Sequence, residues 1–184
     1  VYKSFDYYSI ETIGVIEMRE IIFDIETTTL EPYEEDARVV AIGVKCDNLN
    51  KVFMDTDEDR LLTRFWKSPL FKDKNFQLIG FNSFTFDIPY LIIRSFRHNV
   101  KIPNIKGKSL DLRFILTYGN KFRKGKLDDF SKLILGNNGL KINDGANVKE
   151  LYEKRQYEKI KEYCSHDVFL TFKIFERLKE MQIL

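Results

Sequence analysis

The sequence predicts an α/β protein with a mixed central sheet flanked by helices. Short, apolar and β-branched runs come early in the chain, at residues 21–26, 38–44 and 51–54. Amphipathic segments follow them and alternate with two later strand-like runs. Strands first, with helices between and after them, are typical of a sheet covered by helices. At 184 residues the chain is long enough for a sizeable core, and we expect one domain over residues 1–184.

The first strand carries two acids on one face. Residues 21–26 read Ile-Ile-Phe-Asp-Ile-Glu. Because side chains alternate along a strand, Asp24 and Glu26 point the same way as Ile22. Two charges in a core without partners cost free energy, and a divalent cation held by oxygen ligands would balance both. The alternative is an acidic pair at a strand end that reaches solvent.

The other elements follow from periodicity and from turn residues. Residues 47–50 are expected as a hairpin connection, with the third strand at 51–54. Residues 1–17 are expected as an extended N-terminal segment, and 139–146 as a polar loop. The remaining strands are expected at 75–81 and 110–112. Helices are expected at 57–66, from 88 onward, at 127–135, and from 147 nearly to the end, the last as two helices meeting near Arg155.

Two more aspartates need explaining. Asp87 precedes a helix that has a proline in its first turn, so it could be an N-cap. Asp167 lies in the apolar stripe of the last helix, one turn after Tyr163. A structural Tyr163–Asp167 hydrogen bond is one explanation, although it leaves the charge of the buried aspartate uncompensated. The buried stripe is predicted to contain Ile160, Tyr163, Cys164, Thr171, Ile174, Leu178 and Met181.

Charge is unevenly distributed along the chain. The net charge is +2, but residues 88–126 contain ten Lys/Arg and one acid, so this basic segment carries +9 and the rest −7. An acidic site with a basic approach suits a nuclease, although a solvated lysine-rich surface is the alternative. Cys46 and Cys164 show no pairing or zinc motif, and no apolar run is long enough to span a bilayer. We therefore expect a cytoplasmic, reducing compartment and no membrane association.

Three motifs in order resemble those of the DEDD-type 3′–5′ exonucleases. The first is Phe-Asp-Ile-Glu-Thr at residues 23–27, the second is Asn-Ser-Phe-Thr-Phe-Asp at residues 82–87, and the third is Tyr-Cys-Ser-His-Asp at residues 163–167. The stretches 145–152 and 160–168 are similar to the stand-alone predicted exonucleases related to the proofreading domain of family B DNA polymerases. The glycine that often follows the first motif is absent, and Thr29-Leu30 stand there instead.

The resemblance implies a ribonuclease H-like fold and removal of nucleotides from a 3′ end. It implies two Mg²⁺ or Mn²⁺ ions, held by Asp24, Glu26, Asp87 and Asp167. In the histidine subclass a His lies five positions before the last Asp, where this chain has Glu162. The tyrosine subclass is therefore indicated, with Tyr163 orienting the attacking water, because a tyrosine hydroxyl is a poor base at neutral pH.

The same resemblance suggests substrate contacts at Thr27, Leu30, Asn82 and Phe86, for which ordinary packing is the alternative. The expected substrate is the 3′ end of single-stranded or frayed DNA. An exoribonuclease, a ribonuclease H-like endonuclease and a binding module without catalysis remain alternatives, since carboxylates do not distinguish sugars. A polymerase or repair complex is a conceivable partner, and the sequence does not determine the oligomeric state.

Overall fold

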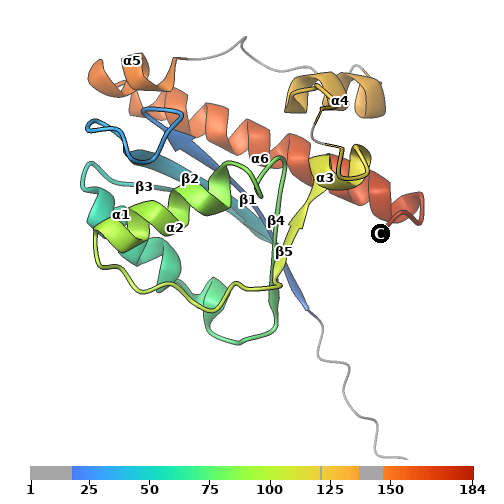
Figure 1. Ribbon diagram of the computed structural model, residues 1–184, viewed down its shortest axis with the longest axis horizontal. Coiled ribbons are helices and arrows are strands. Elements are labelled where there is room, and N and C mark those ends of the chain that lie inside the picture. Colours follow the sequence, from blue (N-terminus) through green and yellow to red (C-terminus); the bar gives the residue numbers. More distant parts are fainter. Residues whose placement is uncertain (1–17, 121, 137–146) are drawn as a thin grey trace, which may run out of the picture.

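Five strands form one mixed sheet in the order β3-β2-β1-β4-β5 (Figure 1). The computed structural model describes residues 18–120, 122–136 and 147–184, so the predicted N-terminal segment 1–17 and the polar loop 139–146 lie outside the described residues. β1 pairs antiparallel with β2 and parallel with β4. β3 extends the sheet antiparallel to β2, and β5 extends it parallel to β4. The strands are β1 (Arg19–Thr27), β2 (Val39–Cys46), β3 (Leu49–Met54), β4 (Phe76–Gly80) and β5 (Ser109–Asp111).

Helices cover both faces of this sheet. One face packs against α1 and α2, and the other against α4, α5 and the long α6 (Figure 1). The predicted α/β architecture with a mixed sheet is confirmed. The helices are α1 (Glu58–Trp66), α2 (Asp87–Arg97), α3 (Leu112–Leu116), α4 (Leu127–Leu135), α5 (Val148–Glu153) and α6 (Tyr157–Glu180), with a short 3-10 turn η1 (Pro69–Phe71).

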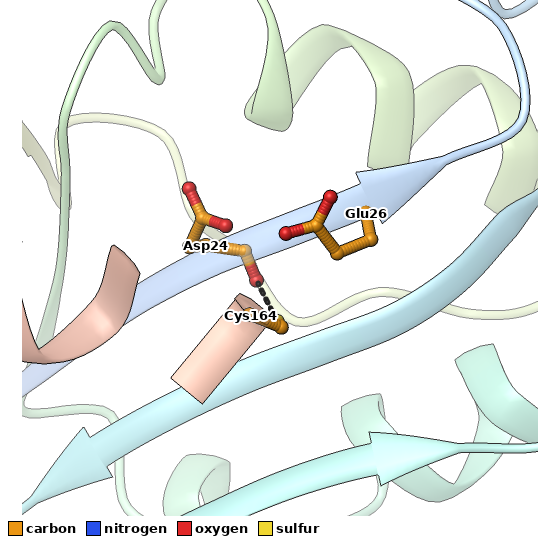
Figure 2. Close-up of side chains that lie close together, drawn as sticks. All are labelled: Asp24, Glu26 and Cys164. Atoms are coloured by element: carbon orange, nitrogen blue, oxygen red, sulfur yellow. Dashed lines mark hydrogen bonds between the residues drawn. The ribbon is translucent and has the colours of Figure 1, made fainter. Parts of the chain in front are cut away.

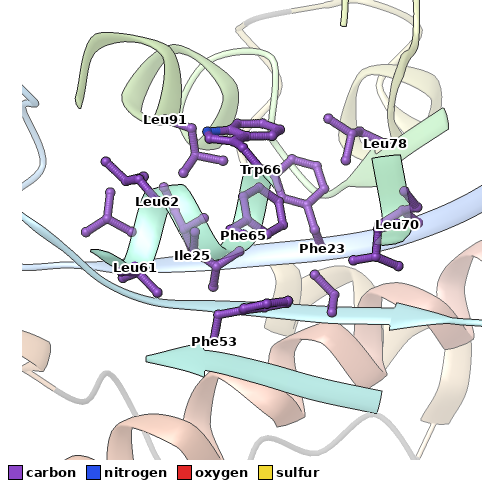
Figure 3. Packing of buried hydrophobic residues seen from close by; sticks show 14 of the residues in the cluster. Phe23, Ile25, Phe53, Leu61, Leu62, Phe65, Trp66, Leu70, Leu78 and Leu91 are labelled. Carbon is purple, nitrogen blue, oxygen red and sulfur yellow. The ribbon is translucent and has the colours of Figure 1, made fainter. Parts of the chain in front are cut away.

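The alternation along β1 determines which face carries the acids. Phe23 and Ile25 pack into the cluster beneath α1 and α2, where the rings of Phe65 and Trp66 lie 4.5 Å apart between centroids (Figure 3). Ile22 belongs instead to the cluster under α6. The intervening acids therefore lie on the α6 side of the sheet.

A glycine lets α6 come close to the sheet beside those acids. Gly43 in β2 is the register partner of Asp24 in β1. A Cβ atom at Gly43 would lie 2.7 Å from the Val168 side chain and 2.8 Å from the Cys164 sulfur, closer than atoms pack. Because Gly43 has no side chain, α6 can pack close to the sheet beside Asp24.

A buried ion pair joins α1 and α2 on the face of the sheet opposite α6. Arg94 donates to Glu58 through Nε at 2.9 Å and through Nη2 at 2.5 Å, and both side chains are buried. Arg94 also donates to the Pro32 carbonyl oxygen in the loop that follows β1. Burial raises the pKa of Glu58, but the hydrogen bonds from Arg94 and from the Val39 amide outweigh it and leave that pKa lowered. Through its bond to Pro32, Arg94 of this pair holds the loop that follows β1 in place.

Several details differ from the sequence expectations. β3 begins at Leu49, so only two residues connect it to β2, and Asp47 has a φ of 49°. The short helix α3 after β5 was not predicted, and Met181 is exposed rather than part of the buried stripe. The two predicted helices near the C-terminus are confirmed, separated around Arg155 with its φ of 54°. None of the helices described here is long and apolar enough to cross a bilayer.

Candidate active site

Asp24 and Glu26 project side by side from β1 toward α6. Figure 2 shows their carboxylates beside Cys164, which comes from α6. One carboxylate oxygen from each acid and the Cys164 sulfur all lie within 4.8 Å of one another. The Cys164 thiol donates weakly to the Asp24 carbonyl oxygen at 3.8 Å. A strand and a helix distant in sequence therefore meet at the acidic pair.

Asp87 lies at the start of α2 and is attached to the same strand. Its Oδ1 accepts a hydrogen bond from the Ile25 amide at 3.1 Å. The N-cap interpretation is wrong, because Phe86 occupies the N-cap position and Asp87 is the first residue of α2, with its carboxylate bonded to an amide of β1. Burial raises the pKa of Asp87 to about 7, the charges of Asp111 and Asp167 add to the rise, and the bond from Ile25 opposes it.

Asp167 comes from α6 and faces a pocket of about 350 Å³. It is buried, with 7% of its surface exposed. Asp24 lines the same pocket, and its charge and that of Asp167 both help to raise the pKa of Cys164. The pocket is lined by Asp24, Phe81, Asn82, Arg113, Gly125, Lys126, Leu127 and Asp167.

The predicted acids therefore gather at one end of β1 without forming a single tight cluster. Asp24 and Glu26 are close together, Asp167 shares a pocket with Asp24, and Asp87 interacts electrostatically with Asp167. Tyr163 is partly buried one helical turn before Asp167. His166, in contrast, places its ring 6.3 Å from that of Phe169 and does not line the pocket.

Among the predicted substrate contacts, Leu30 is exposed and Asn82 lines the pocket, whereas Thr27 and Phe86 are partly buried. Leu30 is 78% exposed in the loop after β1. Asn82 lines the pocket and has a φ of 63°, in the left-handed region that asparagine tolerates. Thr27 donates its hydroxyl to the Thr29 carbonyl oxygen at 2.6 Å. Phe86 is partly buried, with its ring 5.6 Å from that of Tyr90.

Asp111 and Arg113 were not predicted as site residues. Asp111 is 3% exposed, and its carboxylate accepts hydrogen bonds from the amides of Asn82 and Phe84, both at 2.9 Å. Arg113 donates to Asn82 Oδ1 at 3.1 Å and lines the pocket. The sequence offered one indication of their role: an acid and a base lie two residues apart at the junction between β5 and α3.

The donor set fits magnesium or manganese. Aspartate and glutamate oxygens are the ligands that these hard cations prefer. Burial, reinforced by Glu26, Asp24 and Asp167, raises the pKa of Cys164 well above its ordinary value. Sulfur is also a soft ligand, which magnesium and manganese favour less than carboxylate oxygen. Carboxylates that approach one another repel, and divalent ions held between them would reduce that repulsion.

The chain resembles known proteins in sequence and fold. Residues 21–179 match the RNase_H superfamily. An uncharacterized protein of Methanocaldococcus jannaschii is 34% identical over 182 residues, which cover 91% of this chain and 99% of the relative. A DNA polymerase of Archaeoglobus fulgidus is 23% identical over 206 residues, which cover 98% of this chain and 26% of the polymerase.

The fold is also shared with a much larger protein. The structure of the family B DNA polymerase from the hyperthermophilic archaeon Pyrobaculum calidifontis matches with a TM-score of 0.70 and 22% identity, over 91% of this chain and 25% of the polymerase. The chain thus spans about a quarter of the length of the two polymerases that it matches.

Proposed function

Because the chain belongs to the RNase_H superfamily, we propose that it is a metal-dependent 3′–5′ exonuclease. Its substrate is the 3′ end of single-stranded or frayed DNA, from which it releases nucleoside 5′-monophosphates. It belongs on this proposal to the tyrosine subclass of the DEDD exonucleases. The order of the three motifs supports this assignment, together with Tyr163 four positions before Asp167 and a glutamate, Glu162, where the histidine subclass has its histidine.

One observation carries the proposal. Acids from β1 and α6 line a pocket that Arg113 and Lys126 also line. Carboxylates bind divalent cations and basic side chains bind phosphate, so this lining matches a metal-assisted cleavage of a phosphodiester. Arg123 and Lys124, which precede Lys126 in the same loop, are also exposed.

The resemblance of the three motifs suggests a role for each of the chain's own residues. Asp24, Glu26, Asp87 and Asp167 hold two Mg²⁺ or Mn²⁺ ions. When bound, such ions provide a hydroxide nucleophile near neutral pH and neutralise charge that develops on the phosphate. Tyr163 orients the attacking water through its hydroxyl, which is a hydrogen-bond partner rather than a base at neutral pH.

The substrate strand is placed by neighbouring groups. Asn82 presents its side chain at the pocket wall, where Arg113 and the Thr85 hydroxyl fix its Oδ1. Leu30 is exposed beyond the end of β1 and packs against the terminal base on this proposal. Arg113 and Lys126 neutralise the backbone of the strand, and no base sequence is read.

A time course on 5′-labelled oligonucleotides tests the proposal. Matched single-stranded DNA, duplex DNA and RNA are incubated with Mg²⁺ or Mn²⁺, with EDTA as the metal control and Asp24→Asn as the contamination control. A ladder that shortens stepwise from the 3′ end of single-stranded DNA is expected. Cleavage of a covalently closed single-stranded circle, or equal activity of Asp24→Asn, contradicts the proposal, and preferential degradation of RNA reassigns the substrate.

A further inference from the structure

Two exposed phenylalanines lie together beside the pocket. Phe84, in the loop between β4 and α2, is 42% exposed, and Phe114 in α3 is 54% exposed. Their ring centroids are 5.8 Å apart with the planes inclined at 56°. Each ring is close in sequence to a pocket residue, since Asn82 precedes Phe84 by two positions and Arg113 directly precedes Phe114. The pair therefore adjoins the pocket wall formed by Asn82 and Arg113.

A single buried carboxylate holds both phenylalanines in place. Asp111 Oδ2 accepts from the Phe84 amide at 2.9 Å, and Oδ1 accepts from the Phe114 amide at 3.1 Å. Oδ1 also accepts from the Asn82 amide at 2.9 Å. Both oxygens of Asp111 are thus engaged by backbone amides. Its position makes it the structural link between the pocket wall and the two rings.

The ring of Phe114 is supported from behind. Gly119 lies against it so closely that a Cβ atom at that position would be 3.0 Å from the ring. The Gly119 amide donates to the Phe114 carbonyl oxygen at 2.8 Å, closing the turn that follows α3. Exposed apolar rings fixed by backbone contacts, rather than left on a loose loop, indicate a surface prepared for contact.

Positive side chains lie next to Phe114 in α3 and in the loop that is hydrogen-bonded to α3. Arg113 donates to the carbonyl oxygens of Gly125 and Arg123, at 3.2 and 2.7 Å, and so joins α3 to the loop that leads into α4. Figure 1 shows α3 and α4 next to each other on the α6 side of the molecule. In that loop Arg123, Lys124 and Lys126 are exposed. Aromatic faces beside cations match unpaired bases beside phosphates, and a purely apolar protein partner would leave the cations without complement.

We propose that Phe84 and Phe114 form a stacking platform for an unpaired base of the strand whose 3′ end enters the pocket, and that Asp111 is its positioning residue. The proposal rests on the proposed function and specifies its substrate as single-stranded nucleic acid. A paired base cannot use the platform, because its faces are already covered by its neighbours in the duplex. The platform thus favours single strands over duplexes without selecting a sequence.

The test measures binding separately from cleavage. Fluorescence anisotropy of a labelled oligothymidylate ten nucleotides long is recorded in EDTA, where no metal-dependent hydrolysis occurs. Phe84→Ala and Phe114→Ala are each expected to weaken binding by roughly 10-fold, as the loss of one stacked base predicts. Phe84→Tyr and Phe114→Trp keep an aromatic face and are expected to restore most of the affinity, whereas leucine at either position does not.

Two further variants make the result specific. Phe96→Ala removes a phenylalanine near the C-terminal end of α2 that is 88% exposed, more than either platform ring, and is the control, expected to bind as the unchanged protein does. Asp111→Asn should weaken binding, because it loosens the hold on both rings. Adding Phe84→Tyr or Phe114→Trp to Asp111→Asn should not restore the affinity. Thermal unfolding of every variant verifies that the protein is folded at the assay temperature.

Cleavage kinetics separate this proposal from the proposed function. With Mn²⁺, the rise in KM for the oligonucleotide should exceed the fall in kcat for Phe84→Ala and Phe114→Ala. A protein that binds oligothymidylate through the rings but cleaves no substrate overturns the exonuclease and leaves the platform in place. Unchanged affinity of both alanine variants, full rescue by leucine, or duplex binding as tight as single-strand binding overturns the platform.

Discussion

The carboxylate of Asp87 accepts a hydrogen bond from the backbone amide of Ile25, at 3.1 Å. Ile25 stands between Asp24 and Glu26 in β1, so this bond attaches the start of α2 to the strand at the point where the two acids project. Burial raises the pKa of Asp87 to about 7, and the nearby charges of Asp111 and Asp167 add to the rise. In the metal-free protein this acid is therefore partly protonated at neutral pH.

That raised pKa gives the metal-free protein a definite pH dependence. An aspartate in the unfolded chain has a pKa of about 3.9. Between that pH and about 7, the folded state therefore binds more protons at Asp87 than the unfolded state does. The stability contributed by Asp87 consequently falls as pH rises through this window. Asp87→Asn keeps the oxygen that accepts from Ile25 and removes the titration. Urea unfolding in EDTA between pH 5 and 8 should show the unchanged protein losing stability relative to the variant.

The same comparison of the unchanged protein with Asp87→Asn is then repeated with Mn²⁺ in place of EDTA. Because a bound cation favours the ionised carboxylate, Mn²⁺ at pH 8 should stabilise the unchanged protein more than Asp87→Asn. Parallel pH profiles for the two proteins in EDTA would show that Asp87 does not titrate in this range and would contradict the account.

Gly43→Ala tests the contact that sets the height of α6. The added methyl would lie 2.7 Å from the Val168 side chain and 2.8 Å from the Cys164 sulfur. Overpacking of this kind typically costs about 1–3 kcal/mol, and here it also pushes Asp167 away from Asp24. We expect a lower free energy of unfolding and a loss of nuclease activity in protein that is still folded. Val168→Ala, added to Gly43→Ala, makes room and should recover part of both; no recovery argues against the steric cause.

Tyr163→Phe tests the proposed orientation of the attacking water. The substitution keeps the ring and removes the hydroxyl, so kcat should fall by about 100-fold, as for the loss of one positioned hydrogen-bonding group in an active site. KM and Mn²⁺ affinity should change little. Tyr157→Phe, on the same helix, is the matched control. A Tyr163→Phe enzyme with kcat close to that of the control removes Tyr163 from the reaction.

Local pattern predicted the elements that carry the acids. Alternation along residues 21–26 placed Asp24 and Glu26 on one face, and the structure puts their neighbour Ile22 under α6. Helical periodicity placed Asp167 in the buried stripe of the last helix, where it lies. These features depend on neighbours two to four residues away, which the sequence shows directly.

Long-range contacts were beyond the same reasoning. The bond from Ile25 to Asp87 spans 62 positions, so a capping rule that considers only neighbouring residues assigned Asp87 to its own helix. Asp111 received no role because its amide partners at Asn82 and Phe84 come from a different loop, 29 and 27 positions away. The five-residue helix α3 is too short to show a periodic pattern in the sequence. Asp111 is its N-cap, and its side chain accepts a hydrogen bond from the Phe114 amide.

The most direct test of the central claim is anomalous X-ray diffraction from crystals soaked in Mn²⁺, because manganese positions are then observed independently of activity. The account predicts two peaks roughly 3.5–4 Å apart, in contact with oxygens of Asp24, Glu26, Asp87 and Asp167, and loss of at least one peak in Asp24→Asn. No peak between β1 and α6 in active, well-ordered crystals, or manganese bound only elsewhere on the molecule, would contradict it.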